Sequence, residues 1–340
     1  MPAPLAATQA SSHPAHCRCV LSTPREPGAI AVISLLGDPI PALQHLTNRS
    51  DWPIGVMRLV NFLDIDEGLA GCLTSTLAQI MPHGGPHVVR TILDALDDFG
   101  VEMAHGTALL SINEIRTLFP EAQDEIEALA LHTISISHSP FAIDLLLQQS
   151  ARWKNAGGIA DFKPTPDDLA CSTRLAHLIH PPLVVLTGPA NVGKSTLTNA
   201  LIGRTVSITA DAPGTTRDYT TALLDLAGLT VRWHDTPGLR ETTDPIERHA
   251  MMIAHTLLSR ADFIIAITDA DHPWPKLPRD PDLSICSKSD LAVRSDADLC
   301  VSAQTSQNLT TFAELVRDRL VPPADIASNR PWIFDQRLIT

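Results

Sequence analysis

The chain has 340 residues, of which 44% are hydrophobic and 19% charged, so we expect two or three globular domains rather than a disordered chain. Its net charge of −13 argues against a broad basic surface that coats nucleic acid. No apolar run reaches the ~18–20 residues that cross a bilayer, and six scattered cysteines do not suggest a disulfide framework, so a cytoplasmic protein with no membrane partner is expected.

The first hundred residues predict a leader and a small domain. Residues 1–20 are small, polar and proline-containing, which predicts a disordered leader. They include the pattern H-x-x-H-C-x-C, for which a solvated leader and a zinc site are both open. The run GAIAVISLLG from Gly28 predicts a strand, and residues 86–97 carry apolar side chains at helical spacing. We therefore expect an N-terminal α/β domain over 21–104.

The middle of the chain is expected to be helical. Residues 120–153 have the pattern of a helix, a break and a second helix, and glycines and prolines follow in 155–167. We assign 105–179 to a reduced helical connector. The last residues, 323–340, form a tail that either docks through Trp332 and Phe334 or stays loose.

Residues 180–322 alternate strand-like and helical stretches, which predicts an α/β fold with a doubly wound, mostly parallel sheet. The first strand-like run leads into GPANVGKS at 188–195, which fits the pattern G-x-x-x-x-G-K-[ST]. Backbone N–H groups of such a loop surround a phosphate at the positive end of the following helix. The predicted nucleotide-binding residues of this P-loop are Gly188, Asn191, Val192, Gly193, Lys194, Ser195 and Thr196.

Two later stretches are expected on the phosphate side of this site. DAPGTTRD at 211–218 is a loop that can fold over Mg²⁺ and the γ-phosphate through its threonines. WHDTPG at 233–238 ends an apolar strand, where Asp235 can hold Mg²⁺ through a water and the Gly238 N–H can bond the γ-phosphate. With the Ser195 hydroxyl, the predicted Mg²⁺ residues are Ser195, Thr216 and Asp235, and Lys194 reaches the β- and γ-phosphates.

Two further stretches are expected on the base side. LSICSKSD at 283–290 ends a strand, where Asp290 can accept from two donors on the ring edge of guanine and the stem of Lys288 can lie over the base. CVSA at 300–303 ends the last strand, where the Ala303 N–H, beside Ser302, can meet the guanine oxygen. Ligands of open α/β sheets bind at the carboxyl ends of the strands, so these stretches predict GTP and GDP as ligands.

The chain resembles the tRNA modification GTPase family called TrmE or MnmE. STPREPGAIAVISLLGD at 22–38 is similar to the family's opening segment, and PHGGP at 82–86 to its H-G-G-P element before a helix. GTTRD and DTPGLRETTDPIER at 235–248 are similar to its switch regions. The likeness is dense over about 180–322 and short in the N-terminal part, and the helical middle is shorter than in the family.

The resemblance implies a mechanism and partners. Family members use a potassium ion in place of an arginine finger, a group worth ~10³–10⁵ in rate. The ion binds when two GTPase domains dimerise, and the N-terminal domain also dimerises. By position, Asn191 and Thr215 would hold K⁺, Thr216 would sense Mg²⁺, and Glu247 would position the attacking water, so the implied catalytic residues are Glu247, Lys194 and Thr215.

The chain departs from the family at several points. Ser287 stands where the base-reading box N-K-x-D has asparagine, so we expect a weaker tie to the P-loop or to guanine, worth roughly 0.5–1.5 kcal/mol. The terminal C-I-G-K motif and the P-G-E-F-T and F-T-G-E-D elements have no counterpart here, and Ser34 replaces an arginine. The residues therefore give no support for folate binding or for the tRNA-modification chemistry, whereas they support GTP hydrolysis.

Three functions stay open from the sequence. The first is an active GTPase that serves wobble-uridine modification of tRNA with a partner enzyme. The second is a divergent GTPase switch that acts on RNA or the ribosome. The third is a module that binds GTP without hydrolysing it, and the presence of Thr215, Thr216 and Glu247 counts against it.

Overall fold

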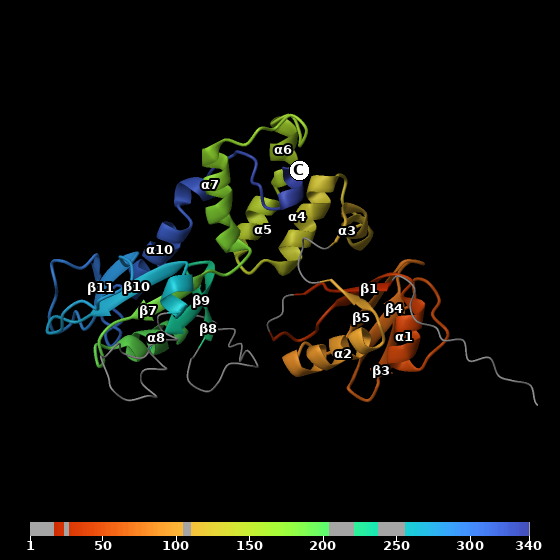
Figure 1. Ribbon diagram of the computed structural model, residues 1–340, viewed down its shortest axis with the longest axis horizontal. Helices are drawn as coiled ribbons and strands as arrows, with labels where there is room; N and C mark the ends of the chain where they lie inside the picture. The colour runs from red at the N-terminus through yellow and green to blue at the C-terminus, as the bar shows by residue number, and fades with distance from the viewer. Residues whose placement is uncertain (1–16, 24–26, 105–109, 204–220, 237–255, 340) are drawn as a thin grey trace, which may run out of the picture. The chain divides into compact units, whose positions relative to one another are not determined.

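The computed structural model describes residues 17–23, 27–104, 110–203, 221–236 and 256–339 (Figure 1). By its internal contacts the chain divides between Ile136 and Ser137 into two compact units. This division falls inside the predicted connector, 105–179, so part of that stretch belongs to each unit. The predicted domain boundaries at 104 and 179 stay predictions.

The N-terminal unit contains a six-stranded sheet. Its order is β3-β4-β5-β2-β1-β6, and its neighbours run antiparallel except for β1 and β6, which are parallel. The strands are β1 (Cys17–Leu21), β2 (Ile33–Gly37), β3 (Arg58–Phe62), β4 (Asp66–Cys72), β5 (Leu77–Met81) and β6 (Glu102–Met103). The strand expected from Gly28 is therefore present as β2, and it starts at Ile33.

Helices cover one face of this sheet. Leu43 of α1 (Ile40–Thr47) and Ile92 of α2 (Pro86–Asp98) share a buried core with Phe62 and Ile80 of the strands. The helix predicted over 86–97 is thus confirmed, with Pro86 at its first turn, where a missing N–H costs nothing. Two further helices, α3 (Ile112–Leu118) and α4 (Glu125–Ile136), complete the unit.

The leader predicted over residues 1–20 extends too far toward the C-terminus, because a strand begins at Cys17. Residues 17–20 belong to β1, which pairs with β2 on one side and β6 on the other. Cys17 and Cys19 are buried in the core of this unit, so they behave as small apolar strand residues rather than as part of a solvated segment. Residues 1–16 lie outside the described residues.

The second unit contains another six-stranded sheet, in the order β12-β11-β10-β7-β9-β8. All neighbours are parallel except β8 and β9, so the doubly wound, mostly parallel sheet is confirmed. The strands are β7 (Leu183–Thr187), β8 (Thr221–Leu226), β9 (Leu229–Asp235), β10 (Phe263–Thr268), β11 (Leu283–Cys286) and β12 (Leu299–Cys300).

Helices lie on both faces of this sheet. Trp233 of β9 donates its indole N–H to Thr198 of α8 (Lys194–Ile202) and packs edge-on against Phe312 of α10 (Leu309–Leu320), so these two helices share one face. On the other face Leu258, in helical residues 256–260, packs with Leu183, Val185 and Ile264.

The C-terminal tail docks in this unit, which is the first of the two alternatives expected for it. The blue C-terminal end lies beside the green helices in Figure 1. The Trp332 N–H donates to the Gln149 side chain at 2.8 Å, and the Trp153 indole donates to the Trp332 carbonyl at 3.2 Å. The helices here are α5 (Pro140–Leu146), α6 (Gln149–Asn155), α7 (Pro166–Leu175), α11 (Pro323–Ile326) and the short 3₁₀ turns Ala176–Leu178 and Gln336–Leu338. Among the described residues, no helix has the length and apolar character needed to cross a membrane.

Candidate nucleotide-binding site

The predicted P-loop lies between β7 and α8. Asn191 and Gly193 have φ values of 64° and 96°, and this left-handed backbone turns the chain tightly into the helix. A Cβ on Gly188 would collide with the Ile267 carbonyl of the neighbouring β10, so only glycine lets the loop leave the sheet here. Val192 is buried beneath the loop, whereas the Asn191 and Thr196 side chains are exposed.

Lys194 lies inside this loop. Its ammonium donates to the carbonyls of Gly188 at 3.1 Å and Pro189 at 2.7 Å, and the side chain is largely buried. Burial lowers the pKa of Lys194, and the nearby Asp235 carboxylate partly opposes this. The loop therefore encloses a positive charge, as binding of a phosphate group requires.

Ser195 and Asp235 meet across the gap between α8 and β9. The Ser195 hydroxyl donates to Asp235 Oδ2 at 3.0 Å. Burial raises the pKa of Asp235, while the Ser195 bond and the Lys194 charge oppose that rise. Asp235 Oδ1 is buried and has no hydrogen-bond partner among the described residues. A hydroxyl and a carboxylate with an unused oxygen are donors that Mg²⁺ prefers, so these residues fit the ion.

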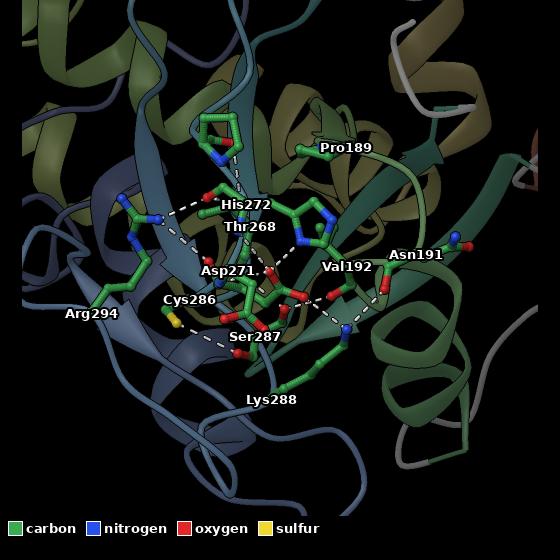
Figure 2. A network of polar contacts seen from close by, with 12 residues as sticks. Pro189, Asn191, Val192, Thr268, Asp271, His272, Cys286, Ser287, Lys288 and Arg294 are labelled. Atoms are coloured by element: carbon green, nitrogen blue, oxygen red, sulfur yellow. Dashed lines mark hydrogen bonds and ion pairs between the residues drawn. The ribbon is translucent and has the colours of Figure 1, made fainter.

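The base-side residues also come together with the P-loop (Figure 2). The Ser287 hydroxyl lies 2.5 Å from the Val192 carbonyl and 3.1 Å from the Thr268 carbonyl. The Lys288 ammonium donates to the Asn191 carbonyl at 2.9 Å. Ser287 therefore keeps a bond to the P-loop through a backbone carbonyl, and the weaker tie that we expected there stays a prediction.

The remaining base-side residues lie at the same end of the sheet. Asp290 is exposed two residues after Lys288, whose φ of 54° turns the chain there. Ser302 is fully buried just after β12, and its hydroxyl accepts the Thr305 N–H at 3.2 Å. Ala303 follows and is half-buried. Their backbone positions agree with the prediction, and their roles toward a base stay predictions.

Four predicted residues lie outside the described residues. They are Thr215, Thr216, Gly238 and Glu247. Their assigned roles toward K⁺, Mg²⁺, the γ-phosphate and water remain predictions, as does the role of Asn191 toward K⁺.

Asp269, which follows β10, was not among the residues predicted for the site. Its carboxylate accepts the Lys288 ammonium at 2.8 Å and lies 2.6 Å from Nδ1 of His272. Burial would raise the pKa of Asp269, but the bonds from Lys288 and His272 outweigh it and hold the pKa at about 2. A polar residue at the carboxyl end of a parallel strand was the signal that singled out Asp235, and the same signal at TDAD could have found Asp269.

Comparisons with known proteins agree with this geometry. Residues 183–290 match the family model described as "50S ribosome-binding GTPase". A protein named tRNA modification GTPase MnmE from Ruegeria sp. is 32% identical over 58% of this chain and 45% of that protein. A protein of the same name from Thermus thermophilus is 26% identical over 89% of this chain and 82% of that protein. The chain thus spans less than half of the first relative and most of the second.

Among solved structures, Era from Aquifex aeolicus bound to GDP·AlF4⁻ is similar to 41% of this chain and 56% of its own, with 25% identity and a TM-score of 0.33.

Proposed function

We propose that the chain binds GTP and hydrolyses it to GDP and phosphate, because it is similar to MnmE proteins and its residues 183–290 match a GTPase family model. The observation that carries the proposal is the Ser195–Asp235 contact of 3.0 Å, beside the enclosed Lys194. It joins the start of the P-loop helix to the end of the neighbouring strand at the carboxyl edge of a parallel sheet. Nucleoside phosphates bind at such an edge.

The residues divide the work on the phosphates. Lys194 lies within the loop and can move its ammonium from the carbonyls of Gly188 and Pro189 to phosphate oxygens. Ser195 and Asp235 would hold Mg²⁺, with Thr216 as a third residue, and the ion, when bound, would neutralise negative charge on the phosphates. Glu247 would orient the attacking water.

Guanine preference rests on the base side of the site. The Asp290 carboxylate is exposed and offers two acceptor oxygens on a loop that Ser287 and Lys288 fasten to the P-loop. Guanine presents two donors on one ring edge, and adenine does not present the same pair. We expect Ala303 to add a backbone N–H to the guanine oxygen.

Potassium dependence and self-association belong to the same proposal. Asn191 and Thr215 would hold K⁺, and the exposed Asn191 side chain supports access for an ion. The outward face of the N-terminal sheet supports a second copy of the chain as partner. There Leu59, Leu69 and Met81 pair in register across β3, β4 and β5, and Leu59 and Leu69 are 65% and 41% exposed. An apolar row on a sheet face is a common feature of homodimer interfaces.

A role in tRNA modification, with a partner enzyme, is the broader proposal. Its support is the name that the relatives share, tRNA modification GTPase MnmE, and the match that covers most of this chain. Complementation of a bacterial strain that lacks MnmE tests it, and failure of a well-expressed protein to restore the modified wobble uridine would contradict it.

The experiment for hydrolysis measures phosphate release by the full chain with GTP, ATP and excess Mg²⁺, and again with EDTA. We expect turnover of GTP that EDTA abolishes and far less turnover of ATP. A Ser195→Ala variant should lose the Mg²⁺-dependent part, whereas Thr311→Ala, which removes an exposed hydroxyl on α10, should not. Equal rates with GTP and ATP, or a rate unaffected by Ser195→Ala, would contradict the proposal.

A further inference from the structure

Ser287 and Lys288 form two parallel ties between the same two parts of the site. Each residue contacts one P-loop carbonyl, that of Val192 or Asn191, and one group at the end of β10. For Ser287 that group is the Thr268 carbonyl, and for Lys288 it is the Asp269 carboxylate. Figure 2 shows both side chains directed from the loop after β11 toward the P-loop.

The two ties are chemically unequal. A hydroxyl has one hydrogen, so Ser287 cannot donate fully to both of its carbonyls at once. An ammonium has three donors, so Lys288 satisfies the Asn191 carbonyl and Asp269 together and keeps one donor. The bond to Asp269 is also charge-assisted, and such bonds are about twice as strong as neutral ones. The Lys288–Asp269 tie is therefore the stronger of the two.

Asp269 is held in place independently of Lys288. Its side chain is 5% exposed, against 42% for Lys288, so the carboxylate is the more enclosed partner of the pair. Oδ1 accepts the backbone N–H groups of Asp271 at 3.2 Å and His272 at 3.1 Å and contacts the His272 ring. Oδ2 is left to receive the lysine.

Arg294 also stabilises the loop after β10, which carries Asp269. Its guanidinium donates to the His272 carbonyl at 2.8 Å and lies over the Trp274 ring at 5.1 Å. Asp296 in turn pairs with Arg294. The turn that carries Asp269 is thus braced before any nucleotide arrives.

We propose that Asp269 is a positioning residue for the guanine nucleotide, which sets the Lys288 stem and the Asp290 carboxylate that follows it in the pose that receives the base. This inference rests on the proposed function, since it assigns the base to this loop. Where the N-K-x-D box has its asparagine, the amide can also hold this loop in place beside the P-loop. Here Ser287 offers a single hydrogen, so the Asp269–Lys288 pair holds more of the loop's position.

The test compares GDP affinity of the full-length chain and its Asp269→Asn variant, using a fluorescent GDP analogue. Loss of a charge-assisted bond predicts a Kd about tenfold higher or more for Asp269→Asn. Asp271→Asn is the matched control, because it makes the same change at an exposed position of the same turn, and its Kd should equal that of the parent. Thermal unfolding of each variant checks that the fold is kept.

A double-mutant cycle separates positioning from general loss of structure. Lys288→Met alone should weaken GDP binding, and adding Asp269→Asn to it should change the Kd by less than about twofold, because the carboxylate acts through the lysine. Additive losses would overturn the proposal. If Asp269→Asn fails to fold, His272→Ala removes one brace of the carboxylate and should raise the Kd about two- to threefold; an unchanged Kd there would overturn the proposal.

GDP binding by the parent chain separates the proposed function from the role of Asp269. If the parent chain binds no GDP, the proposed function is contradicted. If the parent chain binds GDP and the Asp269→Asn variant binds it equally well, only the role of Asp269 is contradicted.

Discussion

The chain forms two six-stranded sheets that differ in what they expose: one face of the first sheet, and the carboxyl ends of the strands in the second. The N-terminal sheet is mostly antiparallel and has its helices α1 and α2 on one face, so residues such as Leu59 and Leu69 remain on the other. The second sheet is mostly parallel with helices on both faces, and its open part is the edge where the strands end. Open faces suit partner proteins and open strand ends suit small ligands, so we propose that the first sheet serves partner binding and the second nucleotide binding.

The largest losses of stability should come from substitutions in the two hydrophobic cores. Only the substitution in the second core should also weaken nucleotide binding. Trp233→Ala removes an indole that contacts both α8 and α10, and Phe62→Ala removes a buried ring from the N-terminal core. Each should cost about 3–5 kcal/mol of unfolding free energy. Urea unfolding with GDP titration should show that only Trp233→Ala weakens nucleotide binding. Loss of GDP binding in a folded Phe62→Ala protein would contradict the assignment of nucleotide binding to the second unit alone.

The next effect concerns Mg²⁺ at the edge of the second sheet. Ser195→Ala removes the hydroxyl that contacts Asp235, and a lost bond to a charged group is worth about 1.5–3 kcal/mol. GDP affinity measured with and without Mg²⁺ should lose its dependence on the ion in this variant. Retained Mg²⁺ dependence would show that the ion is held elsewhere.

A substitution on the exposed face of the first sheet should change the oligomeric state while it changes the unfolding free energy little. Leu59→Glu places a charge in the apolar row and should convert a dimer to a monomer in sedimentation. Because Leu59 is 65% exposed, the unfolding free energy should change by about 0.5 kcal/mol or less. Leu169→Glu, an equal change at an exposed leucine of α7, is the control and should leave the assembly intact. Dimers in both variants would remove this face as the partner site.

The smallest effect is a pH dependence at Asp235. Burial raises the pKa of Asp235 in the folded protein, so the folded state binds more protons than the unfolded state between the ordinary and the raised pKa. Its contribution to stability is therefore present at low pH and is lost as the pH rises through that interval. At neutral pH, without nucleotide or Mg²⁺, Asp235→Asn should raise the melting temperature while it abolishes Mg²⁺-dependent binding. A lower melting temperature would contradict the raised pKa.

Much of the second unit could be predicted from its sequence, because its polar motifs follow strand-like runs such as LVVLT, which forms β7 with every residue buried. Gly188, Lys194 and Asp235 lie where that pattern put them. Asp269 also follows an apolar run, that of β10, but its pairing with Lys288 depends on the three-dimensional approach of two loops, which the run does not predict. The reach of Ser287 to the Val192 carbonyl was equally unpredictable, because it depends on the spacing between two loops.

The N-terminal part was harder to predict. The strand β1 has only five residues, with burial that does not alternate strictly, so its periodicity is too weak to outweigh the polar residues before it. Docking of the tail was undecided for a similar reason, since the partners of Trp332 are Gln149 and Trp153, far away in sequence.

Potassium-dependent hydrolysis can be tested by measuring GTP turnover of the full chain in KCl and in NaCl at equal ionic strength. We expect Mg²⁺-dependent turnover that is faster in potassium, and equal turnover in the two salts for an Asn191→Ala variant. GTP that binds but is not hydrolysed in either salt would contradict the proposed hydrolysis and leave a GTP-binding module.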